Sequence, residues 1–484
     1  MTAPRPEVRT SHPKHYHLIG IAGTAMASLA GLLRAAGHRV TGSDENVYPP
    51  MSDQLRELGI DYAVGFSPDN LRPRPDWVIV GNAISRGNAE LEAVLDERIP
   101  YTSAAGTVKE EFLRTRRPLA VAGTHGKTTT TSLLAWVLES AGLEPSFLIG
   151  GVAENFGSSF RLTDSEWFVV EADEYDTAYF DKGPKMWHYL PFAAVVNNIE
   201  FDHADIYRDE EAYRWAFSRF INLVPRSGAL VAGWDSSIVR ELAPKAFAPV
   251  ESFAYGEELP ADGEHPRWTA EGVSFGPEGT RFTALRGGEP WGEVVTPLTG
   301  AFNVRNCLAV IAVAEFIGAD REGVREGLRT FASVKRRMEV RGEVNGVVVI
   351  DDFAHHPTAV RETIQAVRQR YGSRPLVAVF EPRSYTAQRR EFQQPYQDAF
   401  ADADEVILAG LFHPERYTAE TALNPLELVA AWRAAGKEAH FIPAPDDIVA
   451  HLAPRLSGGE VVLVMSNGGF GNIHQKLLDA LAGG

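Results

Sequence analysis

The stretch PLAVAGTHGKTTTTS, residues 118–132, combines residue types that bind phosphate. Gly123 and Gly126 bracket a turn after an apolar run, and Lys127 and Thr128 follow directly. A loop that leads into a helix presents backbone N–H groups to anions. A lysine there can reach β- and γ-phosphates, and a threonine hydroxyl can bind Mg²⁺. The stretch therefore predicts a site for a nucleoside triphosphate.

The alternative interpretation of this loop is a glycine turn before a threonine-rich helix, with no ligand. The strict phosphate-loop pattern has a glycine five places before Gly126, where this chain has Val121. The G-x-x-G-K-T core nevertheless follows an apolar run and begins a helical stretch, which is the context that the motif requires. We therefore favour the nucleotide site.

Acidic and histidine side chains follow the next two apolar runs. The first cluster consists of Glu171, Asp173, Glu174 and Asp176, and the second of Asp202, His203 and Asp205. Open α/β sheets bind ligands at the carboxyl ends of their strands, so both clusters face the predicted phosphate site. One or two carboxylates suffice for Mg²⁺. We predict Glu171 and His203 as metal ligands, while solvated loops account for most of the other acids.

A third polar group surrounds the apolar run near residue 350. It consists of Arg336, Arg337, Arg341, Asp351, Asp352, His355 and His356. The paired histidines fit either a turn with one core imidazole or a catalytic position. The arginines fit either a solvated face or a phosphate clamp. The residues alone leave these alternatives open.

Three blocks of alternating strand and helix patterns must position these residues. Residues 1–115 begin with an apolar strand over 17–21, a glycine turn, a helix over 24–36 and a strand that ends at Asp44. This is the start of a Rossmann-like domain. Ala22 and Ala25 replace two glycines of the dinucleotide motif, so its signal for a dinucleotide is weak.

The other two blocks complete a three-domain α/β prediction. Residues 116–334 hold the phosphate loop and the acidic clusters, and from Glu257 they include a segment that reads as an insertion or edge sheet. Residues 335–484 have the pattern of a second doubly wound, Rossmann-like domain. We therefore predict two Rossmann-like domains on either side of a central phosphate-loop domain.

The composition narrows the class of protein. The chain has 484 residues and a formal net charge of -17, which argues against a general nucleic-acid or anionic-membrane binder. Its one cysteine, Cys307, excludes an intrachain disulfide. No signal peptide and no apolar run long enough to span a bilayer is visible. We predict a cytoplasmic protein without membrane insertion.

The motifs, taken in order, resemble those of the Mur ligase family, the ATP-dependent amide-bond-forming enzymes of bacterial peptidoglycan. The shared motifs are GTHGKTTT, EADE-x-D, NNIEFDHAD, N-x-x-N near Asn303, RR-M-E and DD-F-A-HHP. The resemblance covers nearly the whole chain, and it implies the three-domain fold and ADP-forming amide-bond synthesis.

The resemblance also implies which residues bind each substrate. The first domain would bind the UDP of UDP-N-acetylmuramate through Gly20, Gly23, Thr24, Ala25, Asp44, Asn82 and Ser85. The central domain would bind ATP through Gly123, Thr124, His125, Gly126, Lys127, Thr128 and Thr129, with Asn303 and Arg337. Mg²⁺ would lie at Thr128, Glu171 and His203, and the catalytic residues would be Lys127, Glu171, His203 and His355.

Within the family, two kinds of member share these motifs. One adds L-alanine to UDP-N-acetylmuramate, and the other adds a murein tripeptide in peptidoglycan recycling. The stretches 46–55, 174–185, 381–384 and 466–478 resemble the tripeptide-adding members, and Ser384 and Ala387 stand where the alanine-adding members carry arginines.

This closer resemblance implies a tripeptide acceptor, L-Ala-γ-D-Glu-meso-diaminopimelate. The lactyl carboxylate of the sugar would be phosphorylated to an acyl phosphate and then attacked by the peptide amine. Contacts to the peptide would come from Arg383, Ser384, Asn467 and His474. L-alanine as the acceptor is the alternative.

The segment after the D-H motif departs from several members of the family. Those members carry a carbamoylated lysine that bridges metals, whereas this chain has no lysine between Lys185 and Lys245. We therefore expect catalysis without a carbamate. Two other classes of protein are alternatives to the ligase interpretation: a nicotinamide-dependent oxidoreductase and a non-catalytic nucleotide switch. The oxidoreductase leaves the phosphate loop unexplained.

Overall fold

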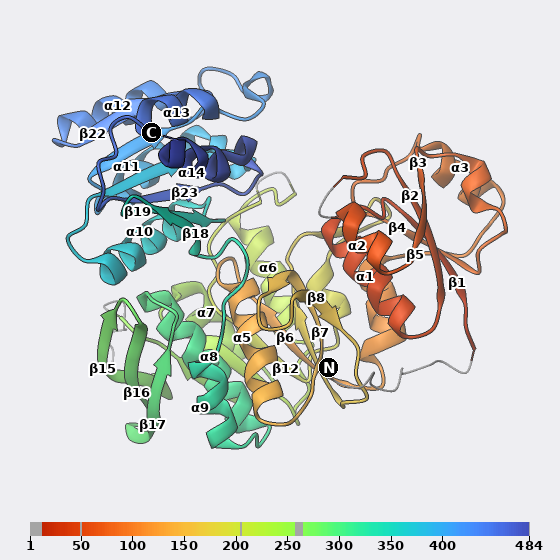
Figure 1. Cartoon of the computed structure of the whole chain (residues 1–484). Coiled ribbons are helices and arrows are strands. Elements are labelled where there is room, and N and C mark those ends of the chain that lie inside the picture. The colour runs from red at the N-terminus through yellow and green to blue at the C-terminus, as the bar shows by residue number, and fades with distance from the viewer. Residues whose placement is uncertain (1–11, 49–50, 204–205, 257–264, 484) are drawn as a thin grey trace.

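The computed structural model describes residues 12–48, 51–203, 206–256 and 265–483, and each of the three parts of the molecule contains one large β-sheet (Figure 1). Asp205 and the beginning of the segment from Glu257 lie outside the described residues. The three sheets confirm the predicted α/β architecture. The division at residues 115/116 and 334/335 stays a prediction, and each sheet falls within one of its blocks.

The first sheet is five-stranded and parallel, with strand order β3-β2-β1-β4-β5. This order is that of a Rossmann-like nucleotide-binding half. The first strand begins two residues before the predicted start at residue 17, and the helix after it ends one residue early. The elements are β1 (His15–Ile19), α1 (Thr24–Ala35), β2 (Arg39–Asp44), α2 (Met51–Glu57), β3 (Asp61–Val64), β4 (Trp77–Val80), α3 (Ala89–Asp96), β5 (Tyr101–Ser103) and α4 (Ala104–Val108).

The central sheet is ten-stranded, with order β17-β16-β15-β14-β13-β12-β6-β9-β7-β8. Its strands are β6 (Arg117–Ala122), β7 (Ser146–Ala153), β8 (Ser158–Arg161), β9 (Trp167–Glu171), β12 (Ala193–Val196), β13 (Ala229–Gly233), β14 (Val250–Phe253), β15 (Trp268–Gly276), β16 (Gly279–Arg286) and β17 (Glu289–Thr296). A separate antiparallel pair consists of β10 (Asp176–Ala178) and β11 (Asp181–Pro184). The helices are α5 (Lys127–Ser140), α6 (Glu210–Ile221), α7 (Ser237–Leu242), α8 (Ala301–Phe316) and α9 (Arg321–Arg329).

The predicted edge segment after residue 257 is the antiparallel extension β15–β17. It is held to the body of the central part because apolar side chains on one face, Trp268 and Phe282, are buried with residues of α8 in one core. Helix α5, which begins at the phosphate loop, packs against α8 and α9. The phosphate loop therefore leads into a helix that is packed against two others.

The third sheet is six-stranded, with order β18-β19-β23-β20-β21-β22, and only β18 runs antiparallel to its neighbour. Its strands are β18 (Glu339–Val344), β19 (Val347–Asp352), β20 (Leu376–Phe380), β21 (Glu405–Leu408), β22 (Glu438–Phe441) and β23 (Val461–Met465). Its helices are α10 (Pro357–Tyr371), α11 (Gln393–Ala399), α12 (Pro425–Ala434), α13 (Pro445–Leu452) and α14 (Ile473–Gly483). Helices cover both faces of the sheet, so every side chain of the central strand β23 is buried. Its sequence, VVLVM, is accordingly apolar throughout.

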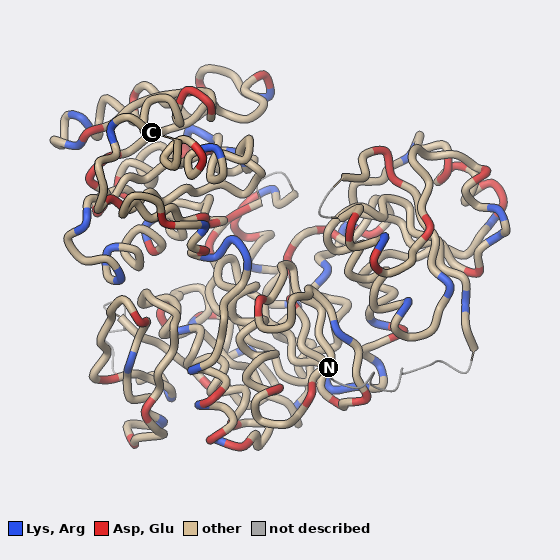
Figure 2. Tube along the Cα trace, in the orientation of Figure 1, with Lys and Arg blue, Asp and Glu red and all other residues tan. Residues whose placement is uncertain are grey.

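The sheet order brings the predicted site residues to one place. Strands β12, β6 and β9 are neighbours and parallel, so the phosphate loop and both acidic clusters emerge at the same edge. The third part lies over this edge, and the first part lies to the side of it (Figure 1). Lys and Arg residues are interspersed with Asp and Glu residues in all three parts (Figure 2). No helix within the described ranges is long and apolar enough to cross a membrane.

Candidate active site

Two glycines shape the loop between β6 and α5. Gly123 has φ +137° and Gly126 has φ +79°, values that favour glycine. A Cβ at Gly126 would lie 2.9 Å from Nδ2 of Asn197 and 3.0 Å from Oδ1 of Asn306. Asparagine amides from the turn after β12 and from α8 therefore enclose the loop. The Asn198 side chain also fixes the loop, since its Oδ1 accepts a 2.8 Å hydrogen bond from the His125 N–H.

Lys127, at the first turn of α5, is held by a buried carboxylate. Its Nζ lies 2.6 and 2.9 Å from the two carboxylate oxygens of Glu174 and donates to the Gly123 carbonyl at 2.7 Å. The Lys127 side chain is 12% exposed and that of Glu174 is fully buried. Burial by itself lowers the pKa of Lys127, but the charges of Glu174 and Asp173 outweigh it and raise the pKa. The lysine is therefore cationic and points to the mouth of the loop.

Glu174 connects the lysine to the histidine of the D-H motif. Nε2 of His203 lies 3.1 Å from Oε1 of Glu174, and the Tyr207 hydroxyl donates to the Glu174 main-chain carbonyl at 2.6 Å. The pKa of Glu174 falls, since its burial is outweighed by the charge of Lys127 and the hydrogen bond from His203. The sequence offered no signal that distinguishes Glu174 from the other acids of its cluster, so its pairing with Lys127 was missed.

Thr128 and Glu171 form a pair of oxygen ligands at the floor of the site. The Thr128 hydroxyl donates to Oε1 of Glu171 at 2.9 Å, and the Gly150 N–H donates to Oε2 at 2.8 Å. Burial raises the pKa of Glu171 despite these two donors. Hydroxyl and carboxylate oxygens side by side fit Mg²⁺, which keeps several waters. That Thr128, Glu171 and His203 bind a metal ion stays a prediction.

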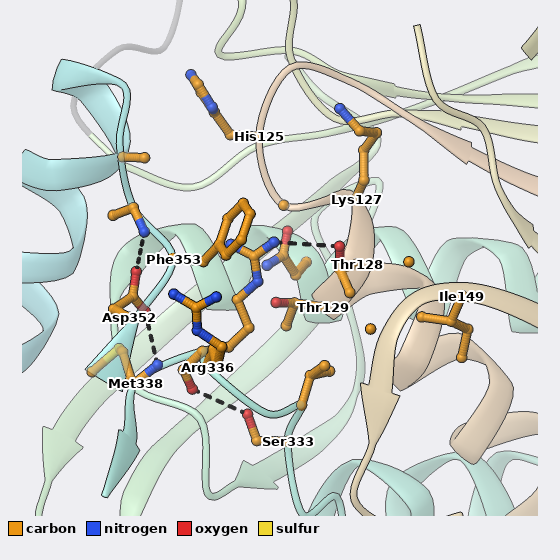
Figure 3. A pocket seen from close by; sticks show the side chains of 18 of the residues that line it. His125, Lys127, Thr128, Thr129, Ile149, Ser333, Arg336, Met338, Asp352 and Phe353 are labelled. Atoms are coloured by element: carbon orange, nitrogen blue, oxygen red, sulfur yellow. Dashed lines mark hydrogen bonds between the residues drawn. The ribbon is translucent and has the colours of Figure 1, made fainter. Parts of the chain in front are cut away.

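Residues of the third part form the opposite wall (Figure 3). Nη2 of Arg337 donates to the Thr128 hydroxyl at 3.3 Å, and its guanidinium lies 4.9 Å from the centre of the Phe353 ring. Burial lowers the pKa of Arg337, while Asp352 opposes that shift. Asp352 accepts hydrogen bonds of 2.7 Å from the N–H groups of residues 338 and 354, which holds the two segments of this wall together. The arginine thus reaches from the third part to the phosphate loop.

A cavity of about 1220 Å³ connects all three parts. Thr24 and Ala25 line it from α1, Asn303 from α8, and the phosphate loop and the Arg337 wall close its other sides. Asn303 is itself held by α8, because its Nδ2 donates to the Thr299 carbonyl at 2.9 Å and its Oδ1 accepts from Asn306 at 3.0 Å. A space of this size exceeds what one drug-sized ligand requires.

The other residues predicted to bind UDP lie on the first part. Asp44 ends β2 and accepts from the Ala22 N–H at 3.0 Å, beside the turn at Gly20 and Gly23. Asn82 donates to Oδ1 of Asp176 at 3.0 Å and so joins the first part to β10. Ser85 is exposed. Their contacts with UDP stay predictions.

The two histidines of the D-D-F-A-H-H-P motif have different surroundings. His355 lines the cavity, and its Nδ1 lies 3.0 Å from the Phe353 carbonyl; burial lowers its pKa. His356 caps the N-terminus of α10 by accepting from the Thr358 N–H, and its ring lies 4.7 Å from that of His125 in the phosphate loop. Burial, and next the charge of His125, lower the pKa of His356 to about 3. The contact of His356 with the loop was not predicted.

The residues predicted to bind the peptide lie outside the lining of the cavity. The Arg383 guanidinium stacks 3.8 Å from the centre of the Phe412 ring, and a Cβ at Gly468 would lie 2.2 Å from Cδ of Arg383. Arg383 and the turn that holds Asn467 are therefore packed together, and only a glycine permits their approach. Oδ1 of Asn467 is buried and has no hydrogen-bond partner within the described part of the chain.

Three further residues of this region are held within the third part. The Ser384 hydroxyl accepts from the Ala387 N–H at 3.0 Å. Ala387 is 1% exposed and packs in the core of the third part. His474 is buried, and its Nε2 lies 3.2 Å from Oδ1 of Asp351. Contacts of Ser384 and His474 with a peptide stay predictions.

Comparisons with known proteins match nearly the whole length of the chain. Family models match residues 15–114 ("Mur ligase family, catalytic domain"), 121–314 ("Mur ligase middle domain") and 336–468 ("Mur ligase, glutamate ligase domain"). An Escherichia coli K12 relative, UDP-N-acetylmuramate–L-alanyl-gamma-D-glutamyl-meso-2,6-diaminoheptandioate ligase, is 42% identical over 96% of this chain and 98% of its own. A Myxococcus xanthus relative, UDP-N-acetylmuramate–L-alanine ligase, is 35% identical over 98% of this chain and 96% of its own.

The fold is also similar to that of solved structures. The crystal structure of a murein peptide ligase from Psychrobacter arcticus 273-4 superposes with a TM-score of 0.71 at 36% identity, and it covers 97% of this chain and 99% of its own. All three parts of the molecule therefore have counterparts in one known protein.

Proposed function

Because this chain belongs to the Mur ligase family, we propose that it joins the tripeptide L-Ala-γ-D-Glu-meso-diaminopimelate to the lactyl carboxylate of UDP-N-acetylmuramate, with conversion of ATP to ADP and phosphate. The observation that carries the choice of acceptor is the 42% identity over 96% of the chain to the tripeptide-adding relative, against 35% for the alanine-adding one. We propose a cytoplasmic location for the reaction, because it consumes ATP.

The first step is transfer of the γ-phosphoryl group from ATP to the lactyl carboxylate. A carboxylate oxygen attacks phosphorus, the bond to the β-phosphate oxygen breaks, and ADP leaves. Lys127 and the loop N–H groups are positioned to bind the phosphates, and Arg337 approaches them from the opposite wall. Positioned positive charge of this kind stabilises the charge that develops in phosphoryl transfer.

The second step forms the amide bond. The peptide amine, in its neutral form, attacks the acyl carbon, a tetrahedral intermediate forms, and phosphate leaves with the bond electrons while the amine loses a proton. His355 lines the cavity and its burial lowers its pKa, so its imidazole is neutral and suited to a site beside the departing phosphate.

A magnesium ion fits the oxygen ligands present. Thr128 and Glu171 would hold it, with His203 at the edge of the site, and the ion would neutralise phosphate charge during transfer. Glu174 contacts both Lys127 and His203 and so holds these two side chains in place. No lysine lies between Lys185 and Lys245, in the segment that contains the D-H motif, so the proposal includes no carbamate.

We propose one binding surface for the UDP group of the sugar substrate and another for the peptide substrate. The turn at Gly20 and Gly23, with Thr24 and Ala25 of α1, would bind the UDP diphosphate on the first part. Arg383 would bind a peptide carboxylate, since a guanidinium contacts a carboxylate through two parallel hydrogen bonds. The Asn467 amide beside it has a buried oxygen that a donor on the peptide would satisfy.

The test is a comparison of two acceptors. Phosphate release is followed with saturating ATP, Mg²⁺ and UDP-N-acetylmuramate, and kcat/KM is measured for the tripeptide and for L-alanine. We expect the tripeptide to be preferred by on the order of 100-fold or more, because unpaired buried polar groups are costly. If L-alanine equals or exceeds the tripeptide, the chain is an alanine-adding ligase. If neither supports turnover, the assignment as a ligase fails.

A further inference from the structure

A group of metal-ligating side chains lies on the outer edge of the third sheet, outside the cavity of the proposed active site. It consists of Glu405 on β21, His440 on the edge strand β22, and His451 in the last turn of α13. β21 and β22 are parallel, with Glu405 opposite Glu438 and Ile407 opposite His440, so Glu405 and His440 project from the same face. Helix α13 places His451 over that face.

The spacing of the three ligand atoms fits a single tetrahedral ion. Oε1 of Glu405 lies 3.7 Å from Nε2 of His440 and 3.7 Å from Nε2 of His451. All three ligand atoms lie within 4.8 Å of one another. A tetrahedral zinc ion with bonds of about 2.0–2.2 Å separates its ligand atoms by about 3.3–3.6 Å. Shifts of a few tenths of an ångström in the side chains would bring both carboxylate contacts to this range.

The carboxylate that points into the group lacks a donor. Oε1 of Glu405 is buried and has no hydrogen-bond partner among the described residues. Buried polar atoms without a partner are rare in native proteins, and a bound ion is one of the causes that account for them. A bound cation would satisfy this oxygen.

One arginine competes for this position. Nη1 of Arg455 lies 2.9 Å from Nε2 of His451, and its Nη2 lies 3.7 Å from Oε2 of Glu405 and also contacts Glu438. The Arg455 side chain is 40% exposed, so it can leave for solvent without opening the core. Its present position shows that the group attracts positive charge.

We propose that Glu405, His440 and His451 form a binding site for one divalent transition-metal ion of the zinc type, with water as the fourth ligand. Two imidazoles and one carboxylate are a ligand set that zinc accepts and that magnesium and calcium disfavour. The ion joins β21, the edge strand β22 and α13. Its occupancy therefore stabilises the third part and is separate from the Mg²⁺ chemistry of the proposed active site.

The test measures zinc binding to the full chain. The protein is stripped with EDTA, and Zn²⁺ is titrated by calorimetry in the absence of nucleotide for the wild type, Glu405→Gln and the double variant His440→Ala/His451→Ala. We expect both variants to bind one Zn²⁺ per chain fewer than the wild type, or to bind it at least about tenfold more weakly, because each lacks direct ligands. His413→Ala, an exposed histidine of the same part, is the matched control and should bind as the wild type does.

Two further readouts separate metal binding from folding. Zn²⁺ should raise the thermal midpoint of the third part in the wild type and not in the double variant, since binding to the native state stabilises it. The rate of phosphate release with Mg²⁺ and without zinc should be the same in the wild type and in the double variant. Arg455→Met should bind Zn²⁺ more tightly than the wild type. Equal zinc stoichiometry and affinity in the wild type and both ligand variants would overturn the proposal, as would weaker binding by Arg455→Met.

Discussion

The buried ion pair between Lys127 and Glu174 makes a prediction about stability as well as catalysis. Replacement of Glu174 by glutamine keeps the shape of the side chain but removes the counter-charge that contacts the Lys127 ammonium, which is 12% exposed. Removal of one partner from a buried ion pair costs about 3–5 kcal/mol. For a folding unit of about 150–250 residues, each kcal/mol shifts the midpoint by about 2–4 °C, so we expect a decrease of roughly 6–20 °C for the central part.

Nucleotide should reverse much of this loss. When phosphates bind at the loop, they supply the negative charge that Lys127 lacks in the variant, so ATP should raise the midpoint of Glu174→Gln more than that of the wild type. The assay is scanning calorimetry of both proteins with and without a non-hydrolysable ATP analogue and Mg²⁺. Glu326→Gln is the matched control, since it breaks an exposed pair with Arg329 on α9, and exposed ion pairs contribute little to stability.

Either of two results would contradict the proposed role of the ion pair between Lys127 and Glu174. A midpoint of Glu174→Gln within the range of the Glu326→Gln control would show that the buried pair does not compensate Lys127. An equal nucleotide-induced rise in Glu174→Gln and the wild type would show that Lys127 does not contact the phosphates.

The remaining predictions concern catalysis, metal and pH. Lys127→Ala should lower kcat by at least about 100-fold while UDP-N-acetylmuramate binding, followed by calorimetry, stays near normal; near-normal turnover would remove the loop from the mechanism. Glu171→Gln and His203→Ala should each raise the Mg²⁺ concentration needed for half-maximal activity, and titrations that overlay the wild type would return these residues to the solvated-loop interpretation. Activity should not change when dissolved CO₂ is removed or bicarbonate is added, and rescue by bicarbonate would reveal a carbamate elsewhere. His356 should destabilise the folded chain at acid pH: its folded pKa of about 3 lies below the ordinary 6.5, so its contribution is complete above pH 6.5 and falls by about 2 kcal/mol at pH 5. His356→Asn keeps a cap on α10 and should lose this pH dependence in denaturant unfolding, whereas His413→Asn should retain it.

Local patterns in the sequence were sufficient for the fold class and for much of the site. The phosphate loop could be predicted because a strand, a glycine turn and a helix N-terminus are short-range features, and the loop between β6 and α5 has that form. The order of parallel strands then places Thr128 beside Glu171 at 2.9 Å, as the strand-end argument expected. The antiparallel extension β15–β17 likewise followed from its turns.

Contacts between distant segments were decided only by tertiary structure. Glu174 pairs with Lys127 because β6 and β9 are neighbours, and no spacing in the sequence singles out that acid among its cluster. His356 meets His125 because the third part closes over the phosphate loop.

The residues near Ser384 also show that residue identity alone does not predict where a side chain packs. The resemblance to the alanine-adding members implies that Ala387 replaces an arginine, and packing places the Ala387 side chain in the core of the third part. The direction in which a side chain points depends on the packing of its whole element, and the identity of the residue does not determine it. The sequence by itself determined which chemistry the chain carries, and the packing of the three sheets decided which groups meet to perform it.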